Sequence, residues 1–124
     1  MLRFTRRHLP VIHQTEASEC GLACLAMVAS FYGHQIDLNT LRRRYPMSLK
    51  GVTLRGLIQT ANHLELVGRP VRFEIGHLRQ LRLPVILHWD MSHFVVLKAV
   101  TRRALTIHDP ATGERSLRFT TTRF

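Results

Sequence analysis

The sequence predicts an α+β fold in which helices come first and an antiparallel sheet follows. Residues 19–64 contain three stretches in which apolar residues recur with helical spacing, whereas residues 84–119 contain short alternating runs separated by turns. A length of 124 residues is enough for one domain with a real core, but not for two. We therefore expect one domain over residues 1–124, with N-terminal helices packed on a C-terminal antiparallel sheet.

The first helix is expected over about residues 19–32, after a basic N-terminal arm at residues 1–9 that no signal-peptide core follows. Ser18 is a plausible N-cap, and Gly33 fits the left-handed position after the helix end. Apolar residues occupy nearly all sides of this helix, which predicts that it is buried on most faces.

A second helix is expected over residues 38–45, where Asp37 or Asn39 can cap the start and Pro46 ends the helix. The simplest interpretation of its arginines, residues 42–44, is that they form the solvated face.

A third helix is expected to begin after Thr53, to continue to about Leu64 and to be closed by Gly68. Residues 70–73 then alternate like a strand, and residues 76–83 predict a short helical connection. Four further strands, separated by turns at 90–92, 102–103 and 109–113, are expected at residues 84–89, 93–100, 105–108 and 115–119.

A candidate nucleophile lies at the start of the first helix. Cys20 would occupy its first turn, where free N–H groups and the helix dipole favour the thiolate. Gln14, six residues earlier, is close enough for its side-chain amide to donate a hydrogen bond beside the sulfur. The alternative is that Cys20 is a small buried apolar residue.

A candidate base and its orienting group lie in the predicted sheet. His93 begins one strand and Asp109 ends the next, and antiparallel pairing brings the start of one strand beside the end of its neighbour. Asp109 could then hold one imidazole nitrogen while the other faces Cys20. His88 and His108 remain alternatives, although His108 should point to the opposite face from Asp109.

The sequence predicts no metal site and no cofactor. Cys20 and Cys24 are one helical turn apart, but no second ligand pair with zinc spacing accompanies them, so Cys24 is expected in the core. A Gly-rich phosphate loop is absent. Two cysteines make no disulfide framework, which favours a reducing compartment.

The formal net charge of +10 suits nucleic acid, an anionic membrane face or an acidic peptide as a partner. A nucleic-acid-binding domain is therefore an alternative, but neither a recognition helix nor a row of aromatic residues on a sheet is present, so we expect no specific nucleic-acid partner. The longest uncharged run, residues 20–36, is too short for a membrane-spanning helix.

Four motifs in order, between about residues 10 and 119, resemble the C39 peptidase family, the N-terminal cysteine-protease domains of bacteriocin-exporting ABC transporters. They are Gln14 with the run 20–27 (CGLACLAM), Tyr32-Gly33, residues 87–97 (LHWDMSHFVVL) and residues 108–113 (HDPATG). The resemblance implies a papain-like fold and cleavage of leader peptides after a Gly-Gly pair, with the leader bound as an amphipathic helix in a shallow apolar groove.

The resemblance also implies a role for each motif residue. Cys20 would be the nucleophile, His93 the base, Asp109 the residue that orients the base, and Gln14 the donor of the oxyanion hole. Glu19 stands where many members of the family carry Asp. We expect this departure to be tolerated, because either carboxylate suits a first helical turn.

The resemblance implies partners as well, namely a double-glycine leader peptide and the transmembrane and ATP-binding domains of the same transporter. The chain is then expected to be a piece of a longer protein, at the cytoplasmic side of the bacterial inner membrane, and a monomer when isolated. Some members of the family have lost the cysteine and only bind cargo. A domain that binds cargo without cutting it is therefore the alternative function.

Overall fold

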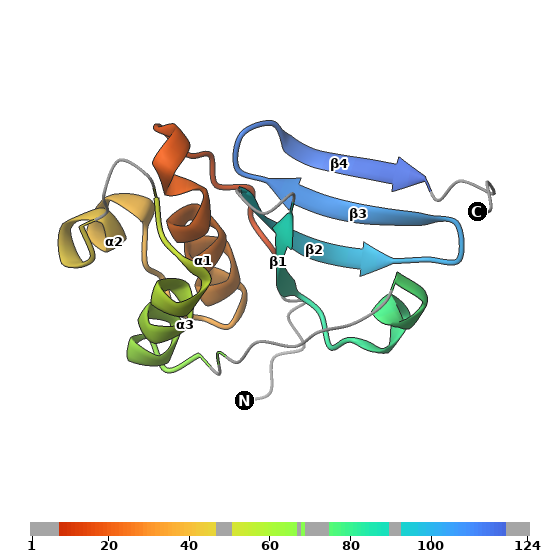
Figure 1. The fold of residues 1–124 in the computed structure, drawn as a ribbon, viewed down its shortest axis with the longest axis horizontal. Coiled ribbons are helices and arrows are strands. Elements are labelled where there is room, and N and C mark those ends of the chain that lie inside the picture. Colours follow the sequence, from red (N-terminus) through yellow and green to blue (C-terminus); the bar gives the residue numbers. More distant parts are fainter. Residues whose placement is uncertain (1–7, 47–50, 67, 69–74, 90–92, 119–124) are drawn as a thin grey trace, which may run out of the picture.

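The computed structural model describes residues 8–46, 51–66, 68, 75–89 and 93–118, and it confirms the predicted α+β layout. In Figure 1 the helices gather beside a four-stranded antiparallel sheet whose strands follow one another in chain order. The elements are η1 (Ala17–Glu19), α1 (Cys20–Phe31), α2 (Leu38–Arg44), α3 (Leu54–His63), η2 (Ile75–Gln80), β1 (Val85–Trp89), β2 (His93–Val100), β3 (Ala104–Asp109) and β4 (Gly113–Arg118).

Helix α1 is the central helix, and its first ten residues, 20–29, are all buried. It ends as predicted. Gly33 has a left-handed backbone (φ 92°), and the N–H of His34 donates to the carbonyl oxygen of Ala29 (2.8 Å). The burial of nearly every face follows from the apolar residues that surround the helix.

The predicted cap at Ser18 is wrong. Ser18 lies inside the 3₁₀ turn η1, and Glu19 occupies the N-cap position of α1. The reason is that the Glu19 carboxylate accepts hydrogen bonds from the N–H groups of Thr15 (3.0 Å) and Glu16 (3.2 Å), which folds the approach into a tight turn before the helix begins.

Helix α2 begins at the predicted cap, because Asp37 accepts a hydrogen bond from the N–H of Thr40 (2.8 Å). Its arginines do not share one solvated face. Arg43 and Arg44 are exposed, but Arg42 is only partly exposed and pairs with the buried Glu19, the residue before α1.

Helix α3 is capped by Thr53, whose hydroxyl oxygen accepts a hydrogen bond from the N–H of Gly56 (3.0 Å). Gly68 does not close it. The left-handed position after the helix is taken by Glu65 (φ 62°), and Gly68 donates its N–H to the side chain of Asn62. The predicted strand at residues 70–73 and the turn at 90–92 lie outside the described residues.

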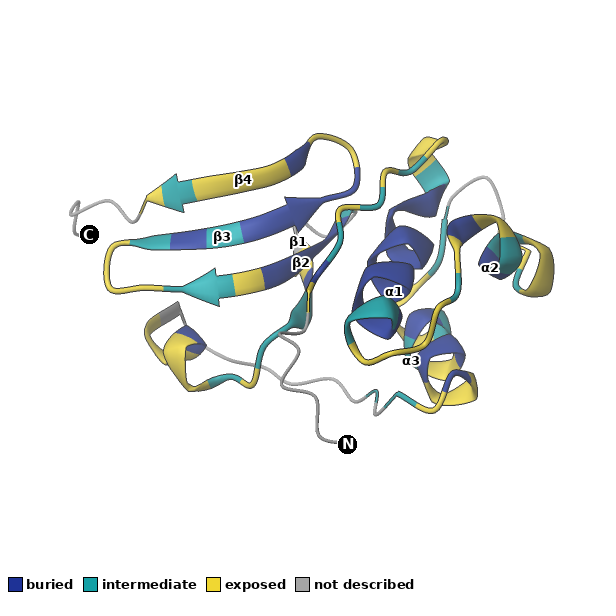
Figure 2. Ribbon diagram, turned by 180° about the vertical axis from the view of Figure 1, so that it is seen from behind, coloured by how far each residue is buried: buried dark blue, intermediate teal, exposed yellow. Residues whose placement is uncertain are grey.

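The sheet separates two groups of buried apolar side chains. Phe94 and Val96 of β2 face the core around α1. Val95 and Leu97 face the opposite core, which includes Leu78 of η2. The 3₁₀ helix η2 confirms the predicted helical connection. Figure 2 shows that α1 and the strands beside it hold most of the buried residues, whereas β4 is largely exposed. In the described part of the chain, no helix is long and apolar enough to cross a membrane.

Candidate active site

His93 and Asp109 form the predicted pair. His93 is the first residue of β2 and Asp109 is the last residue of β3, and 2.7 Å separates Nε2 of the imidazole from Oδ1 of the carboxylate. Both lie at the end of the sheet nearest to α1, where β2 begins and β3 turns into β4 (Figure 1). The bond occupies Nε2, so Nδ1 is the nitrogen that can exchange a proton with a thiol.

The surroundings of Asp109 keep its carboxyl ionised. Burial alone would raise its pKa, but the hydrogen bonds from His93 and from the backbone N–H of Ala111 (2.8 Å) outweigh burial, and the pKa is lowered. Arg115 adds a weaker attraction, with Nη1 3.9 Å from Oδ2. A carboxylate so held both orients the imidazole and stabilises its protonated form.

Cys20 is the first residue of α1, and 6% of its surface is exposed. Within the described residues no hydrogen bond joins it to His93. The start of α1 nevertheless packs against the start of β2, because a Cβ atom on Gly21 would lie 3.4 Å from Cδ2 of Phe94, the residue after His93. The pKa of the Cys24 thiol is raised well above its ordinary value, first by burial and then by the nearby charges of Cys20 and Asp109. Cys24 itself belongs to the core, as predicted.

Gln14 is attached to the same end of the sheet. Its backbone N–H donates to the carbonyl oxygen of Pro110 (3.0 Å), the residue after Asp109. Its side-chain Oε1 is buried without a hydrogen-bond partner. An acceptor that the fold buries without a partner costs about 1–3 kcal/mol, and the N–H₂ of the same amide is the part that could donate to an oxyanion. Such a group is a candidate for contact with a ligand.

Neither of the two alternative histidines shares a hydrogen bond with the Asp109 carboxylate. His88 is exposed, and its ring stacks on Phe94 with the ring centroids 4.5 Å apart. His108 is buried, with Nδ1 3.0 Å from the carbonyl oxygen of Pro10 and Nε2 2.8 Å from Glu114. Through Pro10, His108 anchors the coil segment that leads to Gln14. The sequence did not indicate this role, because the residues of a coil show no pattern that reveals which strand they contact.

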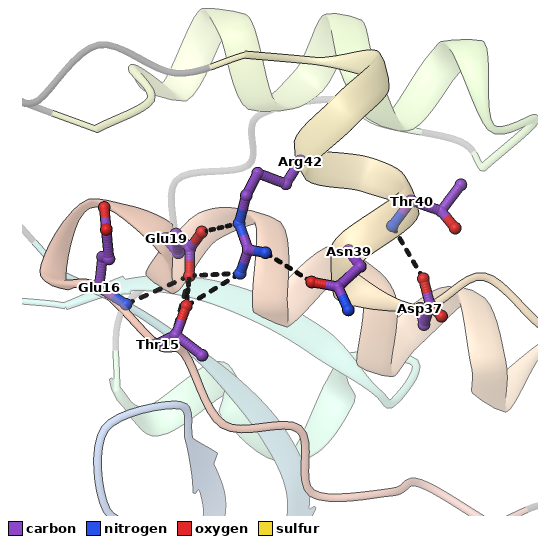
Figure 3. Close-up of polar contacts among 7 residues, drawn as sticks. All are labelled: Thr15, Glu16, Glu19, Asp37, Asn39, Thr40 and Arg42. Atoms are coloured by element: carbon purple, nitrogen blue, oxygen red, sulfur yellow. Dashed lines mark hydrogen bonds and ion pairs between the residues drawn. The ribbon is translucent and has the colours of Figure 1, made fainter.

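Glu19 is the functional candidate that the sequence analysis underestimated. It is 4% exposed, and Arg42, 23 residues further along the chain, donates to its carboxylate (Figure 3). The available signal was a carboxylate directly before Cys20, at the edge of a long uncharged run. Among the described residues, no three His, Cys, Asp or Glu side chains are grouped so that they could hold a metal ion.

A cysteine at the start of a buried helix, next to a sheet that presents a histidine–carboxylate pair, defines the class of papain-like cysteine peptidases. Comparison of the sequence with family models gives the particular family. The model of the Peptidase C39 family matches residues 8–121, and the chain belongs to this family.

Its relatives include transport proteins of Escherichia coli. The chain is 52% identical over 114 residues to the colicin V secretion/processing ATP-binding protein CvaB, and 51% identical over 112 residues to the probable microcin-H47 secretion/processing ATP-binding protein MchF. These alignments cover 92% and 90% of this chain but only 16% of each relative. The chain therefore spans about a sixth of the length of these relatives.

Two solved structures confirm the fold. A double glycine motif protease from an AMS/PCAT transporter, crystallised in complex with the leader peptide, has a TM-score of 0.83 and 34% sequence identity, over 93% of this chain and 83% of that chain. The peptidase domain of Streptococcus ComA, an ABC transporter, has a TM-score of 0.80 at 24% identity, over 90% of this chain and 87% of that one.

Proposed function

We propose that this chain is a cysteine endopeptidase domain that cleaves the leader of a secreted peptide precursor after a Gly-Gly pair, as part of a transporter that exports the peptide. The observation that carries the proposal is the His93–Asp109 pair at one end of the sheet, together with Cys20 as the first residue of α1. Support for the substrate comes from the relatives: the two Escherichia coli proteins are named for secretion and processing, and the solved structure is named as a double glycine motif protease in complex with the leader peptide.

Each of the four candidate residues has a role in the proposed reaction. His93 takes the thiol proton through Nδ1, and the Cys20 thiolate attacks the carbonyl carbon of the second glycine. The side-chain amide of Gln14 donates to the oxyanion. The bond to the following residue breaks, and its amine leaves with the proton from His93. Water, deprotonated by His93, then hydrolyses the acyl-enzyme and frees Cys20, while Asp109 holds the imidazole throughout.

We propose that the requirement for glycine comes from size, since a cleft too narrow for a Cβ atom would accept only glycine beside the bond that is cut. We further propose that the rest of the leader binds as an amphipathic helix and that the isolated domain is a monomer. In the full protein, the domain would work with transmembrane and ATP-binding domains at the cytoplasmic side of the inner membrane.

Cleavage of synthetic precursors tests the proposal. Peptides with a leader that ends in Gly-Gly, followed by a short cargo, are incubated with the domain under reducing conditions, and the products are identified by mass spectrometry. We expect one cut, after the second glycine. Cys20→Ala should abolish the cut, and His93→Ala should slow it by about 10²–10⁴-fold, the contribution of a general base.

A matched peptide with alanine in place of the second glycine is the substrate control and should remain intact. Saturable binding of the Gly-Gly peptide without any cleavage would replace the proposal with the alternative, a domain that holds cargo without cutting it. Cleavage that survives in Cys20→Ala would exclude Cys20 as the nucleophile.

A further inference from the structure

The chain between Gln14 and Cys20 is a turn built around one carboxylate oxygen. Oε1 of Glu19 accepts hydrogen bonds from the N–H of Thr15 (3.0 Å), the hydroxyl of Thr15 (2.7 Å) and the N–H of Glu16 (3.2 Å). The backbone N–H of Glu19 donates in return to the carbonyl oxygen of Glu16 (3.0 Å). The turn is therefore fixed by a side chain at its own end.

A second helix holds this carboxylate from the other side. Arg42 of α2 donates through Nε to Oε2 of Glu19 and through Nη2 to Oε1 (3.1 Å), and Nη2 also donates to the hydroxyl oxygen of Thr15 (2.9 Å). Figure 3 shows the guanidinium placed between the turn and α2, where it also reaches Asn39. A guanidinium that engages both carboxylate oxygens restrains distance and orientation together.

The Glu19 carboxylate is ionised throughout the neutral range. The hydrogen bond from Arg42 is the main cause of its low pKa of about 2, burial opposes it, and the bonds from Thr15 and Glu16 add to the lowering. A buried charge with this many donors is a rigid anchor, because moving it would leave several polar groups without partners.

Both ends of this turn carry a candidate site residue. Gln14 directly precedes Thr15 and is fixed to the sheet through Pro110, and Cys20 directly follows Glu19. The turn therefore sets the distance between the amide that would stabilise the oxyanion and the sulfur that would attack.

We infer that Glu19, held by Arg42 and Thr15, is a positioning residue for the peptidase reaction, and this inference rests on the proposed function. Glu19 acts by placing Gln14 relative to Cys20 and does not touch the peptide. A misplacement of about 1 Å in such a site can cost about 10²-fold in rate. The expected loss lies in kcat, because the interaction with the oxyanion forms only in the transition state.

Steady-state cleavage of the Gly-Gly peptide by Glu19→Gln tests the inference. We expect kcat to fall by about 10- to 100-fold while KM stays within about twofold. Arg43→Met is the matched control, because Arg43 is an exposed neighbour of Arg42 on the same helix, and it should leave both constants unchanged. An unchanged kcat in a folded Glu19→Gln variant overturns the inference.

A milder pair of variants covers the case in which Glu19→Gln does not fold, which circular dichroism would reveal. Thr15→Val removes the hydroxyl that both Glu19 and Arg42 use, at nearly constant volume. It should lower kcat by about 3- to 10-fold, and Thr15→Ser, which keeps the hydroxyl, should restore most of the loss. Equal rates for the valine and serine variants contradict the inference.

A double-mutant cycle with Gln14→Ala distinguishes positioning from general stabilisation. If Glu19 acts through Gln14, Glu19→Gln should slow the Gln14→Ala enzyme by no more than about threefold, because the group to be placed is already gone. Two effects that multiply in full would show that Glu19 acts elsewhere. If the wild-type domain cleaves no Gly-Gly peptide, both the proposed function and this inference are wrong. If the wild type cleaves but the effects of Glu19→Gln and Gln14→Ala on the rate multiply in full, only the inference is wrong.

Discussion

Two buried carboxylates at the candidate site, Glu19 and Asp109, stay ionised for different reasons. A guanidinium is the main cause of the low pKa of Glu19, whereas the imidazole of His93 and a backbone N–H hold Asp109 against the effect of burial. The first carboxylate fixes a turn, and the second fixes the ring of His93, the proposed base. At the scale of the residue, the same chemical group therefore holds backbone in one place and a side chain in the other.

The low pKa of Glu19 makes its contribution to stability dependent on pH. The folded-state pKa of about 2 lies below the ordinary 4.5, so the contribution is complete above pH 4.5 and disappears as the pH falls from about 4.5 towards 2. We expect Glu19→Gln to melt below the wild type at pH 7, and the difference in Tm to shrink between pH 5 and 3. Thermal melts of both proteins across this range measure it. A difference in Tm that is constant with pH would contradict the assigned pKa.

The elements themselves were largely predictable, because they depend on local patterns. The start of α2 at Asp37, the start of α3 at Thr53 and all of β2 lie where the spacing of apolar residues and the capping residues predicted them. The errors at Ser18 and Gly68 have one cause. A local capping signal cannot show that another residue already fixes the helix end. Here the Glu19 carboxylate fixes the turn before α1, and Glu65 takes the left-handed position after α3.

Close packing at the start of α1 gives an element-scale prediction. A Cβ atom on Gly21 would lie 2.5 Å from Cγ1 of Val52, 3.2 Å from Cδ1 of Leu57 and 3.4 Å from Cδ2 of Phe94. Overpacking costs about 1–3 kcal/mol, and the better helix propensity of alanine returns about 1 kcal/mol. We therefore expect Gly21→Ala to lower the free energy of unfolding by about 1 kcal/mol, measured by urea denaturation.

Gly76→Ala is the matched control, because a Cβ atom at Gly76 meets nothing within 4 Å. It should leave the free energy of unfolding unchanged within about 0.5 kcal/mol. Adding Val52→Ala to Gly21→Ala should recover part of the loss by making room for the new methyl group. A Gly21→Ala protein that is more stable than the wild type would show that Val52 moves aside at no cost.

At the scale of the whole molecule, the candidate site is assembled from three regions: the approach to α1, the start of α1 and one end of the sheet. The pairing of His93 with Asp109 was predictable from the antiparallel order of two neighbouring strands. The attachment of the approach to the sheet, through Gln14 to Pro110 and through Pro10 to His108, was not. The approach is irregular coil, and only tertiary structure decides which sheet atoms its polar groups meet.

The distribution of positive charge over the surface leads to the last prediction. The exposed arginines of the described residues are spread over α2, α3, η2, the segment between η2 and β1, the β2–β3 turn and β4, as residues 43, 44, 55, 79, 82, 102, 103, 115 and 118. Phe94 of β2 is buried and offers no surface for base stacking. Diffuse charge of this kind attracts nucleic acid without reading its sequence.

We therefore expect duplex DNA to bind with a Kd no tighter than about 10⁻⁶ M at physiological salt, to weaken steeply as salt rises, and to show no preference among sequences. Fluorescence anisotropy with several labelled duplexes at 50 and 200 mM salt measures all three properties. Cleavage of the Gly-Gly peptide at the same two salt concentrations is the comparison, and its KM should change far less, because the proposed apolar contacts with the leader are not screened by ions. Binding of one duplex at about 10⁻⁸ M or tighter, with others much weaker, would instead identify specific nucleic-acid recognition and would require a different function for the basic surface.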